Sequence, residues 1–467
     1  MNAVTTVAVP PPVTTLSPAL NSRTSRLLEG RIVPVMLSMA WPNVLVMLAQ
    51  ASTGLIETWF VSRLGLDALT GMALVFPGFM MMQMLSGGAM GGGISSAIAR
   101  ALGGRRKADA DALVWHAVII NLTLGVMFSA LVLTFGRTLY QTLGGHGGSL
   151  ESALRYSNVV FIATPLVWLM NGLASTIRGT GNMVVPSLAV CLGVVLLIPL
   201  SPLLIFGYGP VPAMGVVGAG TAVLLTNAAT LLALAWYLLS GRALVRPGSF
   251  RLRFAMFFDI LRVGAVASVS TLQTSLTIAM LTALVGAAAG PDAVAGYGTG
   301  ARLEFLLVPI VFGLGAPLVA LVGTNMGAGQ RERALRIALT GGAIAFGVCE
   351  TVGVAAAIWP EAWLGLFGND PRMVATGVTY LRYAGPGYGF FGLGLSLYFA
   401  SQGAGRLAWP LFAGFLRMAI AVGGGWAAWF VTHDLRAVFA MLSLALVVYG
   451  LVLLSAIKAG VWFRRIV

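Results

Sequence analysis

Charged side chains are scarce in this sequence of 467 residues: only 9% are Asp, Glu, Lys or Arg, whereas 58% are hydrophobic. A soluble domain of this length needs a more polar surface, so the composition excludes a soluble protein. The net charge is +14, but the basic residues lie between long apolar runs rather than in one patch. We therefore interpret them as topology signals of a multi-pass membrane protein and expect no nucleic-acid partner.

Residue types that carry much enzyme chemistry are also rare. The two lysines, Lys107 and Lys458, do not follow glycine, which excludes a Walker-type phosphate-binding loop. Cys191 and Cys349 lie inside apolar runs, and the three histidines are far apart, so we expect no metal site. An intramembrane enzyme would need a cluster of His, Asp or Cys at one depth. We find no such cluster and predict no catalytic residue, no cofactor and no enzymatic activity.

Twelve apolar runs are long enough to cross a bilayer, which takes about 20 helical residues. Arginines concentrate in every second connection, which places both termini in the cytoplasm by the positive-inside rule. We expect a multi-pass protein of the cytoplasmic (inner) membrane with an all-α fold. The runs lie near residues 32–61, 68–98, 112–135, 156–177, 184–207, 214–239, 258–287, 293–324, 335–358, 374–400, 409–431 and 436–460.

Short stretches recur about 224 residues apart, which indicates an internal duplication. Residues 178–182 (RGTGN) match residues 402–406 (QGAGR), and Tyr156 matches Tyr380. Each half then holds six spans. Because six is even, both halves run in the same sense, and a pseudo-two-fold axis along the membrane normal relates the two lobes.

The domain organisation follows from the repeat and from composition. Residues 1–30 are rich in Thr, Ser and Pro and are expected to form a disordered cytoplasmic tail. The first six-helix lobe covers 31–240 and the second covers 257–467. The basic stretch 241–256 is the predicted cytoplasmic linker between them.

A single carboxylate interrupts the first apolar run, in which Glu57 is the only ionisable side chain between Ile32 and Val61. Asn43 and Gln50 precede it at intervals of seven residues and fall close to the same helix face. Ionisable groups inside a membrane are functional candidates, so this face predicts a polar cavity. The alternative is that Glu57 marks the membrane boundary.

Several motifs together resemble the multidrug and toxic compound extrusion transporters over about residues 30 to 460. They are residues 57–65 (ETWFVSRLG), where the family usually has Asp in place of Glu57, residues 213–219 (AMGVVGA), and residues 296–329 with ARLE and VGTNMGAG. The resemblance implies two six-helix lobes around a cleft that opens alternately to each side. It also implies export of organic, cationic or amphipathic compounds in exchange for a proton or sodium ion, by a monomer surrounded by lipid.

The family's sodium ligands are largely absent here. Ser201 and Leu197 stand where the family has an Asp and an Asn, and the tenth span has no acid. Because a sodium site needs several oxygen ligands, we expect H⁺ as the coupling ion, with Na⁺ as the alternative. Burial disfavours a charged carboxylate, so Glu57 is the expected proton carrier. Glu304 is the second candidate, and the alternative is that it belongs to a structural ion-pair network with its neighbour Arg302. Glu350, in the ninth span, is a weaker candidate, and the alternative is that it packs against neighbouring helices.

Polar and adaptable side chains predict the substrate cleft, because methionine packs against varied shapes. Ordinary core packing is the alternative for the Met and aromatic positions. A rival function is a flippase or exporter of a lipid-linked or amphiphilic metabolite, whose cleft would be basic, and Arg302 and Arg417 keep it open. The expected cleft residues are Asn43, Gln50, Met80, Gln83, Trp168, Asn171, Gln273, Thr277 and Tyr297.

Overall fold

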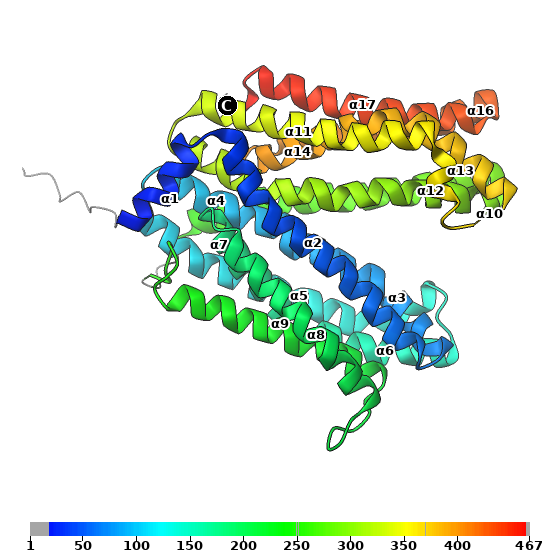
Figure 1. Ribbon diagram of the computed structural model, residues 1–467, viewed down its shortest axis with the longest axis horizontal. Helices are drawn as coiled ribbons and strands as arrows, with labels where there is room; N and C mark the ends of the chain where they lie inside the picture. Colours follow the sequence, from blue (N-terminus) through cyan, green and yellow to red (C-terminus); the bar gives the residue numbers. More distant parts are fainter. Residues whose placement is uncertain (1–17, 249, 251, 369, 464–467) are drawn as a thin grey trace, which may run out of the picture.

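Figure 1 presents the computed structural model, which describes residues 18–248, 250, 252–368 and 370–463. These residues form helices joined by short connections. Within the described ranges there is no β-strand, and a single isolated bridge pairs Tyr208 with Val211. The predicted all-α class is confirmed.

The first lobe contains the helices that correspond to the first six predicted spans. A π-helical turn, Met84–Met90, continues α3 into α4, and a 45° bend separates α6 from α7, so each of these pairs makes one span. The helices are α2 (Ile32–Ser62), α3 (Leu66–Gln83), α4 (Gly91–Gly103), α5 (Lys107–Thr142), α6 (Gly147–Ile162), α7 (Thr164–Gly179), α8 (Val184–Phe206) and α9 (Val216–Leu239).

The second lobe begins with a helix of 74 residues, α10 (Phe254–Gly327). Gly290, at φ 80°, interrupts its helical backbone and divides it into the seventh and eighth spans. The other helices are α11 (Arg331–Ile358), the short α12 (Pro360–Leu364), α13 (Pro371–Ala384), α14 (Tyr388–Ala404), α15 (Ala408–Met418), α16 (Gly425–Thr432) and α17 (Leu435–Lys458). A 3₁₀ turn, Gly385–Gly387, joins α13 to α14, and a π-helical turn, Ala419–Gly424, joins α15 to α16.

The number of helices agrees with the predicted spans. In the described chain, nine helices are long and apolar enough to cross a membrane, and the bent pair α6 and α7 makes a tenth span. The two halves of α10 account for one more span, and α13 with α14 accounts for the last. The twelve-span, two-lobe fold is therefore confirmed.

The two lobes meet at one end of the molecule and diverge toward the other (Figure 1). Helix α1 (Pro18–Glu29) and the end of α17 both lie at the end where the lobes meet. We call this the basic end, because Arg100, Arg331 and Lys458 lie there, at the ends of α4, α11 and α17. The other end is called the open end.

Part of the predicted disordered tail is ordered. Residues 18–29 form α1, whereas residues 1–17 lie outside the described ranges. Leu27 is 4% exposed, and its carbonyl oxygen accepts a hydrogen bond from Asn325 Nδ2 at 3.2 Å. Composition alone does not reveal this helix, because it is stabilised by a contact with the second lobe.

The linker between the lobes is bound to the first lobe. The backbone N–H of Arg246 donates to Asp111 Oδ1 at 2.9 Å, and that of Arg253 donates to His116 Nε2 at 2.9 Å. The Arg253 guanidinium also pairs with Asp109 at 2.5 Å. All three acceptors lie in the first three turns of α5, so Arg246 and Arg253 are both bound to the first lobe.

The two glycines Gly353 and Gly385 bring α11 into direct contact with the α13–α14 junction. A Cβ on Gly353 would lie 2.1 Å from the Gly385 carbonyl oxygen, and one on Gly385 would lie 2.5 Å from the Gly353 carbonyl oxygen. We therefore expect Gly353→Val to destabilise the protein by about 3 kcal/mol through overpacking. The measurement is the melting temperature in detergent. Gly347→Val is the control, because nothing lies within 4 Å of a Cβ there, and equal melting temperatures would refute this packing argument.

Candidate functional site

Glu57 lies on α2 in the interior of the first lobe. It is 6% exposed, and its Oε1 atom has no hydrogen-bond partner. Tyr156 on α6 is also buried. In the described part of the chain, no arginine or lysine forms an ion pair with Glu57. Glu57 thus lies in the protein interior without a compensating cation.

Helix α8, which packs against α2, contributes the positions where the family's further ligands are expected. Ser201 is fully buried, and its hydroxyl has no hydrogen-bond partner. Leu197 is 6% exposed and offers no oxygen. Across the residues described, no three His, Cys, Asp or Glu side chains gather in a way that would hold a metal ion. Of these two α8 positions, only Ser201 offers a side-chain oxygen.

The other two members of the predicted polar face of α2 differ in their exposure. Asn43 is 3% exposed and donates through Nδ2 to the carbonyl oxygen of Met39 at 3.1 Å. Gln50 is exposed. The seven-residue spacing predicts one face for these side chains, but the face is buried at Asn43 and Glu57 and exposed at Gln50.

Two predicted cleft residues of the first lobe are hydrogen-bonded to each other. Asn171 Nδ2 on α7 donates to Gln83 Oε1 at 3.1 Å and to Ser86 Oγ at 2.8 Å. Ser86 was not predicted, and it lies in the π-helical turn after α3. Met80 is 39% exposed, whereas Trp168 is 4% exposed within the core of the first lobe and its Nε1 has no partner.

In the second lobe, Gln273 and Thr277 are buried on α10. Gln273 Nε2 donates to Thr277 Oγ1 and to the carbonyl oxygen of Gly414, both at 3.0 Å. Because Gly414 belongs to α15, the Gln273 amide joins the seventh and eleventh spans.

Glu304 lies at one end of a row of tyrosines. Tyr380 donates through its hydroxyl to Glu304 Oε2 at 3.2 Å, and Tyr388 donates to the Tyr380 hydroxyl at 3.3 Å. The predicted cleft residue Tyr297 contacts the edge of Tyr380, with ring centroids 5.2 Å apart. The sequence reading missed Tyr380 and Tyr388 as site residues, although the repeat had already paired Tyr380 with Tyr156.

Arg417 on α15 is 8% exposed and lies over the rings of Tyr449 at 5.1 Å and Phe391 at 5.8 Å. Arg302, the neighbour proposed from sequence as an ion-pair partner, is exposed and lies 5.5 Å above the ring of Phe367 instead.

Glu350 has a structural contact. Its Oε2 atom accepts a hydrogen bond from the backbone N–H of Gly389 at 2.8 Å. This bond satisfies a donor at the start of α14, which otherwise has no partner in its own helix. It therefore ties α11 to the first turn of α14.

The two candidate acids have different surroundings: Glu57 is buried, whereas Glu304 is half-buried and accepts a hydrogen bond from Tyr380. The acids themselves are not equivalent under the repeat. Glu57 comes from the first span, whereas Glu304 comes from the eighth span, which corresponds to the second span of the first lobe.

A cavity of about 590 Å³ lies elsewhere, at the basic end. It is lined by Ile32 and by residues 329–333 and Arg336, none of which is a candidate coupling or cleft residue. Its position at the ends of α10 and α11 excludes it as the predicted central cleft.

Comparisons of the sequence and of the structure with known proteins indicate the same family. The MatE family profile matches residues 42–203 and 266–426. An FAD transporter of Shewanella oneidensis is 27% identical over 370 residues, covering 79% of this chain and 81% of that protein. A probable multidrug resistance protein NorM of Thermotoga maritima is 26% identical over 377 residues, covering 80% of each. A solved structure described as the outward-facing conformation of a multidrug resistance MATE family transporter has a TM-score of 0.84 and 26% identity, covering 94% of this chain and 98% of that one.

Proposed function

Because the chain belongs to the MatE family of multidrug and toxic compound extrusion transporters, we propose that it exports organic cationic or amphipathic compounds in exchange for protons. The observation that supports proton coupling is that Glu57 is a buried carboxyl group with one oxygen that lacks a hydrogen-bond partner. Such a group binds a proton readily and releases it when a cation or water reaches it.

The shortage of oxygen donors supports the proton over sodium. A sodium ion in a protein is held by several oxygens, as calcium is, whereas a proton needs one. On α8, Ser201 supplies a hydroxyl and Leu197 supplies no oxygen at the positions where the family has ligands. In the second lobe, Glu304 already accepts a hydrogen bond from the Tyr380 hydroxyl.

The proposed orientation places the basic end in the cytoplasm. Positively charged connections stay on the cytoplasmic side of a bacterial inner membrane, and the basic end carries most of them. The lobes meet at this end, so the open end faces outward in this conformation (Figure 1).

The test uses everted vesicles, in which export becomes uptake. We expect ethidium uptake driven by an imposed pH gradient, acidic inside the vesicle, and no uptake driven by a sodium gradient alone. Uptake under a sodium gradient at equal pH would show that sodium, and not the proton, is the coupling ion. Absence of uptake under both gradients would reject cationic drug export.

A second candidate substrate is an anionic amphiphile. One relative is named an FAD transporter, and Arg417 is a buried guanidinium whose Nε has no partner in the described structure. A guanidinium of this kind is suited to a carboxylate or phosphate. The same vesicles discriminate the two, because uptake of FAD without uptake of ethidium would favour the anionic substrate.

A further inference from the structure

The contacts between the two lobes are concentrated toward the basic end. In the described ranges, the hydrogen bonds that join helices of the first lobe to helices of the second involve Arg100 and Gln402. Asn325 and Arg333 of the second lobe add bonds to Leu27 and Gly30, in the segment that precedes the first lobe. If the lobes alternate as proposed, these bonds break each time the cytoplasmic side opens.

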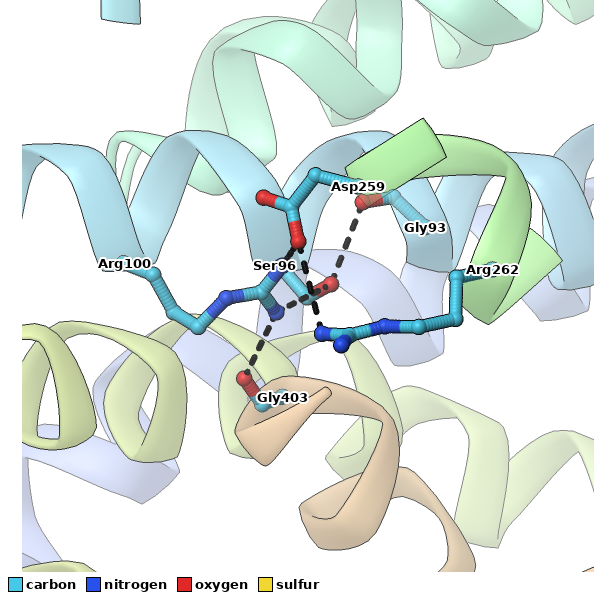
Figure 2. A network of polar contacts seen from close by, with 6 residues as sticks. All are labelled: Gly93, Ser96, Arg100, Asp259, Arg262 and Gly403. Atoms are coloured by element: carbon cyan, nitrogen blue, oxygen red, sulfur yellow. Dashed lines mark hydrogen bonds and ion pairs between the residues drawn. The ribbon is translucent and has the colours of Figure 1, made fainter. Parts of the chain in front are cut away.

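Arg100 makes the one ion pair among these contacts (Figure 2). It comes from α4 in the first lobe and extends between α10 and α14 of the second lobe. Its Nη2 donates to Asp259 Oδ1 at 2.8 Å, and its Nη1 donates to the Gly403 carbonyl oxygen at 3.3 Å and to Ser96 Oγ at 2.9 Å. The guanidinium therefore bridges three helices while its side chain is only 13% exposed.

The space around the guanidinium is kept open by a glycine. Gly405 has φ +71°, and a Cβ there would lie 2.9 Å from Arg100 Nη1. A side chain at this position would be strained and would also crowd the arginine. The site is thus shaped for Arg100 from the opposite lobe.

The equivalent positions of the internal repeat do not contain this ion pair. The residue 224 positions after Arg100 is Thr324, and the residue 224 positions before Asp259 is Val35. Gly181, the counterpart of Gly405, also has positive φ, but its Cβ would meet Leu27 rather than a guanidinium. The ion pair between Arg100 and Asp259 therefore has no counterpart at the repeat-related positions.

Asp259 has a second basic neighbour on its own helix. Arg262 Nη2 lies 3.5 Å from the same Oδ1 atom, in an i,i+3 arrangement (Figure 2). Arg262 is 45% exposed and stays with Asp259 when α4 moves away. It can therefore keep the carboxylate paired after Arg100 has left, which lowers the free-energy cost of separating the lobes.

We propose that Arg100 and Asp259 form a cytoplasmic latch that stabilises the outward-facing state, and that Arg262 takes over Asp259 when the lobes separate. The proposal rests on the proposed function, because it assumes alternating access. The two arginines contact the same oxygen of Asp259 but favour opposite states of the protein. Loss of Arg100 favours the cytoplasm-open state, whereas loss of Arg262 favours the latched state.

The experiment measures conformation directly, without substrate or ion gradient. Two spin-label pairs are introduced, after replacement of the native Cys191 and Cys349. Ser240 with Ala459 reports the cytoplasmic ends of α9 and α17, and Thr70 with Ala295 reports the open ends of the lobes; all four positions are exposed. Distances are read by double electron–electron resonance in lipid nanodiscs.

Arg100→Ala is expected to raise the ratio of cytoplasm-open to latched molecules by about tenfold, with the Thr70–Ala295 distance shortening in the same molecules. Asp259→Asn should do the same, and the double variant should add little to either single change. Arg262→Ala should lower the ratio. Lys107→Ala is the matched control, since its ion pair with Asp111 lies within α5 and should leave both distances unchanged.

Unchanged distances in Arg100→Ala, or shifts of both arginine variants in the same direction, would overturn the latch. If Arg100→Ala fails to fold, Arg100→Lys and Asp259→Asn give the same reading, and the lysine variant should show a smaller shift because it loses the forked geometry. Failure of the transport assay would reject the proposed function while leaving these distance changes measurable, so the two failures are distinguishable.

Discussion

Glu57→Gln is expected to lower pH-driven ethidium transport to below about a tenth of the wild-type rate. Glutamine resembles the protonated acid in shape and cannot release a proton, so the exchange step has no carrier. Folding should be preserved, because Glu57 has no ion-pair partner in the described structure and its Oε1 accepts no hydrogen bond. The measurement is the initial rate of uptake in everted vesicles over a range of imposed pH gradients.

Glu350→Gln is the matched control for this prediction. Glu350 is also a membrane carboxyl, but its Oε2 accepts the Gly389 N–H, and a glutamine oxygen can do the same. We expect at least about half of the wild-type transport rate, because the structural bond is kept. A Glu57→Gln protein that still transports with the wild-type pH dependence would refute Glu57 as the proton carrier.

Gly103→Val is the second change with a large expected effect. A Cβ on Gly103 of α4 would lie 1.9 Å from the carbonyl oxygen of Thr324 on α10, in the other lobe. The repeat-related contact is equally close, since a Cβ on Gly327 would lie 2.1 Å from the carbonyl oxygen of Arg100. Both contacts are between backbones, so no side chain can rotate away to make room.

The valine should therefore prevent closure of the basic end without unfolding either lobe. Overpacking costs about 1–3 kcal/mol, which disfavours the outward-facing state by up to about a hundredfold. We expect transport to fall by more than about tenfold while the melting temperature of the detergent-solubilised protein changes little. Gly88→Ala is the control, because its Cβ would lie 3.8 Å from Phe312, an ordinary contact across the same interface. Wild-type transport by Gly103→Val would show that this backbone contact is dispensable.

Much of the fold could be predicted from the sequence, because a membrane forces apolar helices of a limited length. The offset of 224 residues also relates Gly103 to Gly327, which make equivalent contacts. The helix α1 could not be predicted in this way. Its sequence is polar, and Leu27 is buried only because Asn325 and Gly181 of distant segments lie against it.

The candidate site was less predictable than the fold. Glu57 and Glu304 were found because a carboxylate in an apolar run is conspicuous. Tyr380 and Tyr388 beside Glu304, and Ser86 beside Asn171, were not found, since they resemble ordinary membrane residues until the helices are packed. Periodicity also indicates which residues share a helix face, but not which faces meet, and Gln50 and Glu57 differ in exposure for that reason.

The attachment of the linker to α5 has a mechanical consequence. Because Arg246 and Arg253 are bound by Asp111, His116 and Asp109, we expect these two residues to move with the first lobe. The pivot between the halves then lies at the start of α10, where Phe254 is five residues before Asp259. A rotation about that pivot carries Asp259 through a short arc past Arg100, so small angular changes suffice to make or break the ion pair.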